Sequence, residues 1–268
     1  MNSYGVLETE TVLDDLSLNV EQIRNLGYST LDSNFSDAEI NEIRARSLKL
    51  AEKYLEIYGH HDLKALGESN SFRAPGLIDP FLFEVAAHAK LLELISRLIT
   101  GRFYLNQQNL VINPPLSKNY EQLKYHRDLP YQHYVSSRPL AINALYAVDD
   151  FTVENGATYV IPASHKAEKF PSEKYLASAQ TQIVVKAGTF LILDCMLYHA
   201  AAPNISMSER IGLNHVFSSV MFSPQINWET AIAERNLSLT SAISSLLGLE
   251  FNSPKNVNEY LKTRKVKY

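Results

Sequence analysis

The run FYLNQQNLVI at residues 103–112 opens the part of the chain that decides the fold. Four more short runs follow it, bounded by Pro, Gly and Asn: Leu140–Val148, Ala157–Ile161, Gln182–Leu193 and Ile211–Met221. Several of these runs are rich in Val, Ile, Tyr and Phe, the residues that favour β-strands. The sequence therefore predicts a mainly β region from about residue 101 onward.

Helical patterning dominates the first hundred residues. Ser36 followed by Glu39 has the pattern of a capping box ahead of a periodic apolar segment. Residues 81–99 carry a second apolar periodicity, which stops at Gly101. Helices are expected again from Trp228 to Leu247, so the β region is flanked by helices on both sides.

A mainly β middle with flanking helices predicts a double-stranded β-helix, or jelly-roll, core with helical support. The 268 residues are expected to form a single domain. Its helical N-terminal part covers about 1–100, the jelly-roll core about 101–222 and the C-terminal helices about 223–268.

Composition excludes several classes of protein. A hydrophobic fraction of 46% with 20% charged residues is typical of a soluble globular domain. The net charge of −4 argues against a nucleic-acid partner, and the most apolar window, 189–203, is too short to span a membrane. Cys195 is the only cysteine, so no internal disulfide is expected. We expect a cytoplasmic protein with a small-molecule substrate, and leave a homo-oligomer open.

The segment Tyr125-His126-Arg127-Asp128 contains the most informative side chains. Successive side chains alternate along an extended strand, so His126 and Asp128 point the same way. His199, 73 positions further on, would add a second imidazole from a neighbouring strand. Two imidazoles and one carboxylate on one face of a metal, with open positions opposite, are the ligand set of non-haem Fe(II) oxygenases.

Other interpretations of these residues stay open. A His-x-Asp triplet alone is weak, and both residues could lie in a surface loop. His133 could replace His126 as a ligand, although Pro130 separates it from the predicted strand.

Arg210, eleven residues after His199, strengthens the metal hypothesis. A guanidinium binds carboxylates bidentately, so Arg210 could hold the far end of a dicarboxylate such as 2-oxoglutarate. The alternative is a surface ion pair with Glu209. The apolar run 211–216 favours a buried strand that begins at Arg210.

The ordered set of motifs resembles the phytanoyl-CoA dioxygenase (PhyH) family from about Gly27-Tyr28 to Phe222. The motifs are 125–128 (YHRD), 154–158 (ENGAT), 161–166 (IPASHK), His199 and Arg210. The resemblance implies a jelly-roll oxygenase that uses Fe(II), 2-oxoglutarate and O2. It implies that His126, Asp128 and His199 bind iron and that Arg210 binds the distal carboxylate of 2-oxoglutarate.

The resemblance also implies roles for further residues. Thr158 matches a position that contacts the co-substrate in some members, although a β-branched residue there also suits strand packing. Gln107 and Asn109 are similar in position to amides that face substrate or co-substrate, or they are polar residues of a sheet edge.

Two positions depart from the family pattern. Lys124 stands where members often carry Gln, and it either reaches the co-substrate site or faces solvent. Ala163 stands where Gly is common, which should restrict the turn. Asp128 is intact, whereas halogenating relatives usually have a small residue there, so hydroxylation of an unactivated C–H bond is favoured.

Candidate substrate-binding residues surround the metal motif, and residues 114–124 are a candidate lid. The set is Arg127, Tyr131, Tyr134 and Arg138. Two other functions compete with the oxygenase: a catalytically inactive jelly-roll protein that binds metal or acts as a sensor, and a metal enzyme of cupin type. Cupins usually carry a His-x-His pair, and none occurs in this sequence.

Overall fold

The computed structural model describes residues 4–117, 121–129, 134–251, 254 and 256–265. Its α-helices are α1 (Asp15–Leu26), α2 (Asp37–Tyr58), α3 (His60–Ala65), α4 (Phe81–Ala86), α5 (Ala89–Leu98), α6 (Glu173–Ala179), α7 (Trp228–Glu234), α8 (Ser241–Leu246) and α9 (Val257–Lys265). Its strands are β1 (Tyr28–Asp32), β2 (Ser71–Arg73), β3 (Phe103–Asn113), β4 (Ala141–Ala147), β5 (Thr158–Val160), β6 (Thr181–Ile183), β7 (Thr189–Asp194), β8 (His199–Ala200) and β9 (Arg210–Ser219).

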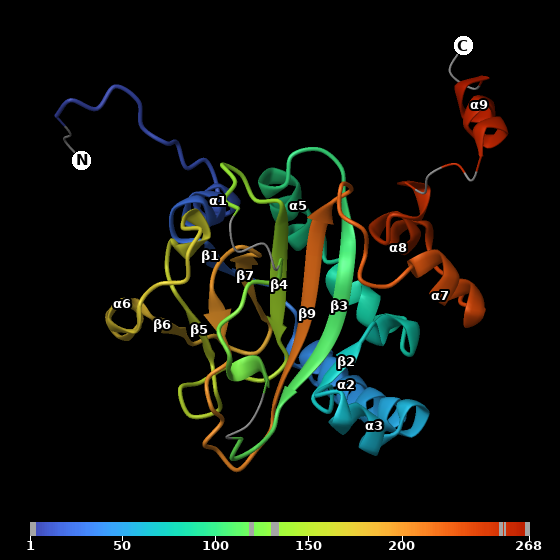
Figure 1. Cartoon of the computed structure of the whole chain (residues 1–268), viewed down its shortest axis with the longest axis horizontal. Helices are drawn as coiled ribbons and strands as arrows, with labels where there is room; N and C mark the ends of the chain where they lie inside the picture. The colour runs from blue at the N-terminus through green and yellow to red at the C-terminus, as the bar shows by residue number, and fades with distance from the viewer. Residues whose placement is uncertain (1–3, 118–120, 130–133, 252–253, 255, 266–268) are drawn as a thin grey trace.

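The strands form two antiparallel sheets. The larger has six strands in the order β1-β7-β4-β9-β3-β2, and the smaller has three in the order β6-β5-β8. In Figure 1 the long strands β4, β9 and β3 run side by side through the middle of the molecule, with β5 and β6 to their left and α7 and α8 to their right. These two sheets with flanking helices confirm the predicted mainly β, jelly-roll architecture.

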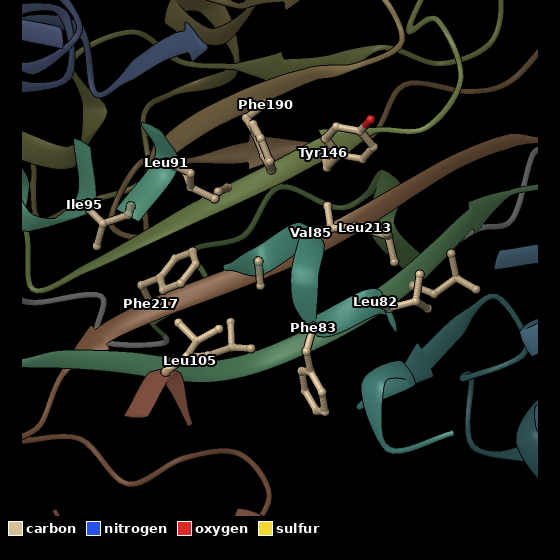
Figure 2. Packing of buried hydrophobic residues seen from close by; sticks show 14 of the residues in the cluster. Leu82, Phe83, Val85, Leu91, Ile95, Leu105, Tyr146, Phe190, Leu213 and Phe217 are labelled. Carbon is tan, nitrogen blue, oxygen red and sulfur yellow. The ribbon is translucent and has the colours of Figure 1, made fainter. Parts of the chain in front are cut away.

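One face of the large sheet packs against the helices. Alternate residues of β4 and β9, such as Tyr146, Leu213 and Phe217, join a buried cluster with residues of α4 and α5. Figure 2 shows these side chains meeting Leu82, Leu91 and their neighbours. The apolar residues of α4 and α5 are therefore buried against a sheet face with a two-residue period.

The opposite face of the large sheet meets the small sheet. Leu191 and Leu193 of β7 pack there with Val160 of β5 and Ile183 of β6. Because neighbouring residues of one strand point to opposite faces, β7 contributes to both clusters at once.

The N-terminal hundred residues contain more than helices. The capping box is present, because Ser36 and Glu39 bond reciprocally at the start of α2. However, β1 and β2 also lie in this part and form the two edges of the large sheet, pairing with β7 and β3. Among the helices of the described residues, none is long and apolar enough to cross a membrane.

Candidate metal centre

Backbone pairing brings the two halves of the predicted ligand set together. His126 lies outside the regular strands and forms an isolated antiparallel bridge with His199 of β8. The two residues exchange N–H···O bonds of 3.0 and 3.1 Å. The Asp128 N–H donates to the Cys195 carbonyl at 3.1 Å, which anchors the other end of the triplet. His126 and Asp128 thus reach the site from a short extended segment, rather than from the regular strand that we expected.

Both imidazoles are oriented by the carbonyl two residues before them. His126 Nδ1 lies 2.9 Å from the Lys124 carbonyl and His199 Nδ1 lies 3.0 Å from the Leu197 carbonyl. A carbonyl only accepts, so each Nδ1 carries the proton and each Nε2 keeps a lone pair. This arrangement, in which a backbone carbonyl fixes the tautomer, is typical of histidines that bind metals through Nε2.

The carboxylate of Asp128 completes the cluster. One ligand atom from each of His126, Asp128 and His199 lies within 4.8 Å of the others. Asp128 Oδ1 is 3.8 Å from His199 Nε2, and the two side chains are only 8% and 9% exposed. The three donors therefore converge on one point from one side.

The environment of His199 favours the neutral imidazole. Burial lowers the pKa of His199, His126 lowers it further, and the nearby Asp128 carboxylate opposes this shift. Burial is the largest of these effects, and it disfavours the charged form. A neutral imidazole is the form that binds a metal.

A cavity connects the cluster with Arg210. Its lining includes His126, His199, Thr158 and Arg210. The cavity and its solvent-filled mouth together have a volume of about 490 Å³. Arg210 is buried at the start of β9, with its guanidinium carbon 4.1 Å from the centre of the Phe151 ring. Glu209 instead pairs with Arg44 at 3.2 Å. The cavity is thus lined by both imidazoles and by a buried cation, and the Asp128 carboxylate lies 3.8 Å from His199 Nε2.

The predicted co-substrate residues differ in their distance from this cavity. Thr158 lines it from β5 and is buried. Gln107 and Asn109 share a sheet face with Val111, which lines the cavity, but they lie beyond its lining and hydrogen-bond to each other at 3.3 Å. Lys124 is exposed, and its backbone carbonyl contacts His126 Nδ1.

Of the predicted substrate residues, Arg127, Tyr134 and Arg138 do not line the cavity. Arg127 points the opposite way from its neighbours: it is buried, stacks on the Tyr198 ring at 4.0 Å and donates to the Ser164 carbonyl at 3.0 Å. Tyr134 is exposed, and Arg138 donates to Thr100 Oγ1 at 2.9 Å. Tyr131 lies outside the described residues, as do 118–120 of the candidate lid.

Three amides that the sequence analysis passed over line the cavity: Gln122, Asn143 and Asn214. Asn143 lies in β4 and donates from Nδ2 to Asp128 Oδ2 at 2.9 Å. A signal for it was present, because Asn143 is the one amide in the apolar run 140–148. Asn214 interrupts the run 211–216 in the same way.

Comparison with known proteins gives a family match. The model of the family described as phytanoyl-CoA dioxygenase (PhyH) matches residues 23–212. Uncharacterized protein Rv1501 of Mycobacterium tuberculosis is 28% identical over 259 residues, which cover 95% of this chain and 93% of that protein. Dioxygenase olcK of Penicillium canescens is 29% identical over 164 residues, covering 58% of this chain and 50% of olcK.

Solved structures share the fold. EctD from S. alaskensis, solved with 2-oxoglutarate and 5-hydroxyectoine, superposes with a TM-score of 0.64 at 22% identity and covers 81% of each chain. The non-heme monooxygenase ThoJ gives a TM-score of 0.61 at 20% identity, with 79% of this chain and 80% of ThoJ covered. At these identities the likeness shows a common architecture.

Proposed function

The chain belongs to the phytanoyl-CoA dioxygenase (PhyH) family and is a dioxygenase, and from this we propose that it is an Fe(II)- and 2-oxoglutarate-dependent oxygenase. We propose further that it hydroxylates an unactivated C–H bond of a small molecule, with release of succinate and CO2. Its place of action would be the cytoplasm, without a nucleic-acid or membrane partner.

The observation that carries the proposal is the convergence of His126 Nε2, His199 Nε2 and an oxygen of Asp128. Two neutral imidazoles and one carboxylate fit Fe(II) and leave the remaining coordination positions open. When bound there, iron would supply the activation of O2 that a protein side chain cannot provide. The protein's own task is to hold these donors rigid and to position substrate beside them.

The opposite end of the cavity suits the co-substrate. Arg210 supplies a buried guanidinium, which binds a carboxylate more strongly than an exposed one does, because water does not screen the pair. Thr158 adds a hydroxyl from the facing sheet. A dicarboxylate that lies between the metal donors and Arg210 would have each end held by a group of opposite charge.

The remaining cavity wall supports a small-molecule substrate. Besides the proposed metal ligands and Arg210, its described lining is apolar, amide or hydroxyl, as Leu145, Leu193 and Asn214 illustrate. EctD, which shares the fold, was solved with the small molecule 5-hydroxyectoine. For this chain, Gln107, Asn109, Lys124, Arg127, Tyr131, Tyr134 and Arg138 stay predictions as contacts of substrate or co-substrate.

Anaerobic titration of the apo-protein tests the proposal. Fe(II) and then 2-oxoglutarate are added while the weak visible charge-transfer band of the chelate is recorded. We expect a band in the wild type, no band in His199→Ala, and a band in Arg210→Ala that needs at least about 10-fold more 2-oxoglutarate, because a charged hydrogen-bonding partner is worth about 1.5–3 kcal/mol.

Matched controls use side chains of the same type outside the cavity. His61→Ala removes an exposed histidine, and Arg235→Ala removes an arginine that donates to the Tyr58 hydroxyl at 2.8 Å and does not line the cavity, so neither should alter the band. Absence of the band in folded wild-type protein would refute the Fe(II)/2-oxoglutarate proposal. An unchanged band in Arg210→Ala would refute only the role of Arg210.

A further inference from the structure

One side chain of the large sheet holds the Asp128 carboxylate. Asn143 Nδ2 lies 2.9 Å from Asp128 Oδ2, and Asn143 is only 2% exposed. A carboxylate can only accept at this position, so the amide atom that faces it must be the nitrogen. The orientation of the Asn143 amide is therefore fixed by chemistry, and its carbonyl oxygen must point away from Asp128.

The contact leaves one carboxylate oxygen for the metal. Oδ2 accepts from Asn143, while Oδ1 faces His199 Nε2 at 3.8 Å. The main chain of Asp128 is held separately by its N–H bond to the Cys195 carbonyl. The backbone hydrogen bond fixes the position of the Asp128 main chain. The hydrogen bond from Asn143 fixes the rotation of the carboxylate about χ2, a torsion with no sharp preference of its own.

We propose that Asn143 is a positioning residue of the metal centre, which fixes Asp128 so that Oδ1 alone faces the metal. This inference rests on the proposed function, because it assumes that Asp128 is a metal ligand. Asn143 acts through Asp128 and contributes no metal-binding donor of its own in this arrangement.

An amide is an unusual side chain for the position of Asn143. Its strand neighbours Ile142, Ala144 and Leu145 are apolar or small, and Asn disfavours strands. Asn143 Oδ1 is buried and has no hydrogen-bond partner among the described residues. Apolar and β-branched side chains are the usual choice at such a strand position, so the amide is best explained by its bond to Asp128.

The expected consequence is a change in metal affinity. Groups that orient a metal ligand without touching the metal are typically worth 10- to 100-fold in affinity. Replacement of Asn143 by Leu keeps a similar volume and removes the donor. The Asp128 carboxylate would then lose the bond that fixes its rotation, and the cost of ordering it would fall on the binding of the metal.

The experiment compares four proteins: the wild type, Asn143→Leu, Asn214→Leu and Asp128→Ala. Asn214 is the matched control, because it also lines the cavity and its Oδ1 also lacks a partner, but it lies on β9 without a recorded bond to Asp128. Each apo-protein is titrated anaerobically with Co(II), and both the visible Co(II) absorption and the metal-induced rise in Tm are recorded.

We expect Asn143→Leu to raise the Co(II) Kd about 10- to 100-fold. The visible Co(II) spectrum of the saturated variant should also change, because a carboxylate that the amide no longer holds can bind the metal through both oxygens. Asn214→Leu should stay within about twofold of the wild type in Kd, with an unchanged spectrum. A residue with a purely structural role would move the Tm of the apo-protein and leave the spectrum of the bound metal unchanged.

Two results would overturn the inference. One is a Kd for Asn143→Leu within twofold of the wild type, and the other is an equal loss in Asn143→Leu and Asn214→Leu. If Asn143→Leu does not fold, Asn143→Ala, which matches the small residues beside it, is judged by the same criteria. Failure of the wild type to bind Co(II), or binding that survives Asp128→Ala, would instead refute the proposed metal site itself.

Discussion

The two faces of the six-stranded sheet are built from the same strands but have opposite character. On β9, Ile211, Leu213 and Phe217 face the helices and are fully buried among apolar side chains. The residues that alternate with them along the strand, such as Arg210 and Asn214, face the cavity. One sequence period thus encodes stability and the alternate positions encode chemistry, because a strand points successive side chains to opposite sides.

The contrast between the two faces shows how the sheet separates stability from ligand binding. The helix-facing side is mostly apolar, and two of its polar residues, Gln108 and His215, bond to each other at 3.2 Å. The cavity-facing side tolerates buried amides with unsatisfied oxygens, such as those of Asn109, Asn143 and Asn214. Substitutions on the first face should therefore mainly change stability, whereas substitutions of the second-face groups that hold a ligand should mainly change binding.

The largest expected effect is on the cavity side. Asp128→Ala should lower succinate formation from 2-oxoglutarate by more than about 100-fold, since even groups that only orient a metal ligand are worth 10- to 100-fold. The free energy of unfolding of the apo-protein should fall by only about 1–3 kcal/mol, because the variant leaves the buried Asn143 Nδ2 without its acceptor. Turnover assays and urea denaturation check both halves. Wild-type turnover in this variant would contradict the metal assignment.

The matching change on the helix side is Phe217→Ala. The Phe217 side chain is fully buried, so its truncation should cost about 3–5 kcal/mol through lost burial and the cavity left behind. Under conditions where the variant remains folded, its metal affinity should equal that of the wild type. Loss of metal affinity without loss of stability would break the separation of the two faces.

A pH experiment tests the same comparison through His215, a buried histidine of the helix-facing side. Burial lowers the pKa of His215 to about 3, whereas an unfolded histidine titrates near 6.5. The unfolded state therefore binds more protons between these values, and stability falls as the pH drops from about 6.5 toward 3. At pH 5 the loss is about 2 kcal/mol relative to neutral pH.

His215→Leu should remove this part of the pH dependence, and urea unfolding between pH 5 and pH 8 measures it. The change in slope is the criterion, because the variant also leaves a Gln108 N–H without its partner. An unchanged slope would show that His215 protonates in the folded state, and hence that this face is less dry than described.

The smallest expected effect lies in a turn that belongs to neither face. Ala163 adopts a left-handed conformation with φ 62°, which costs a residue with a Cβ roughly 1–2 kcal/mol. The residue is exposed, so Ala163→Gly loses little packing. After the greater chain entropy of glycine is subtracted, the variant should be about 0.5–1 kcal/mol more stable. A thermal melt checks this, and a lower Tm would show that the turn is held by other contacts.

Much of the fold was readable from local patterns, and the misses have physical causes. The capping box at Ser36 and the strands of residues 101–222 follow from side-chain chemistry over a few residues. The edge strands β1 and β2 were not predicted, because edge strands are short and gain their identity from the strand that they pair with. The run Gln182–Leu193 divides into β6 and β7, with Gly188 at φ 86° before β7.

The candidate site shows the same division. Residue type and spacing point to His126, Asp128, His199 and Arg210. The structure clusters the first three, and His126, His199 and Arg210 line one cavity. Arg127 was grouped with them by its position in the sequence, although the alternation that aligns His126 with Asp128 also turns Arg127 away. It is buried against Tyr198 instead.

The sequence by itself determined the chemical groups: two imidazoles, one carboxylate, one guanidinium and an alternating β region to carry them. The tertiary structure decided which groups meet, because these contacts depend on pairing between segments far apart in the sequence. His126 and His199, for example, pair across 73 positions, and β4 pairs with β9. The tertiary structure also decided which nitrogen of each imidazole is left to bind a metal, and it gave Asn143 its contact with Asp128. Such contacts depend on distances in space, and no pattern of neighbouring residues contains them.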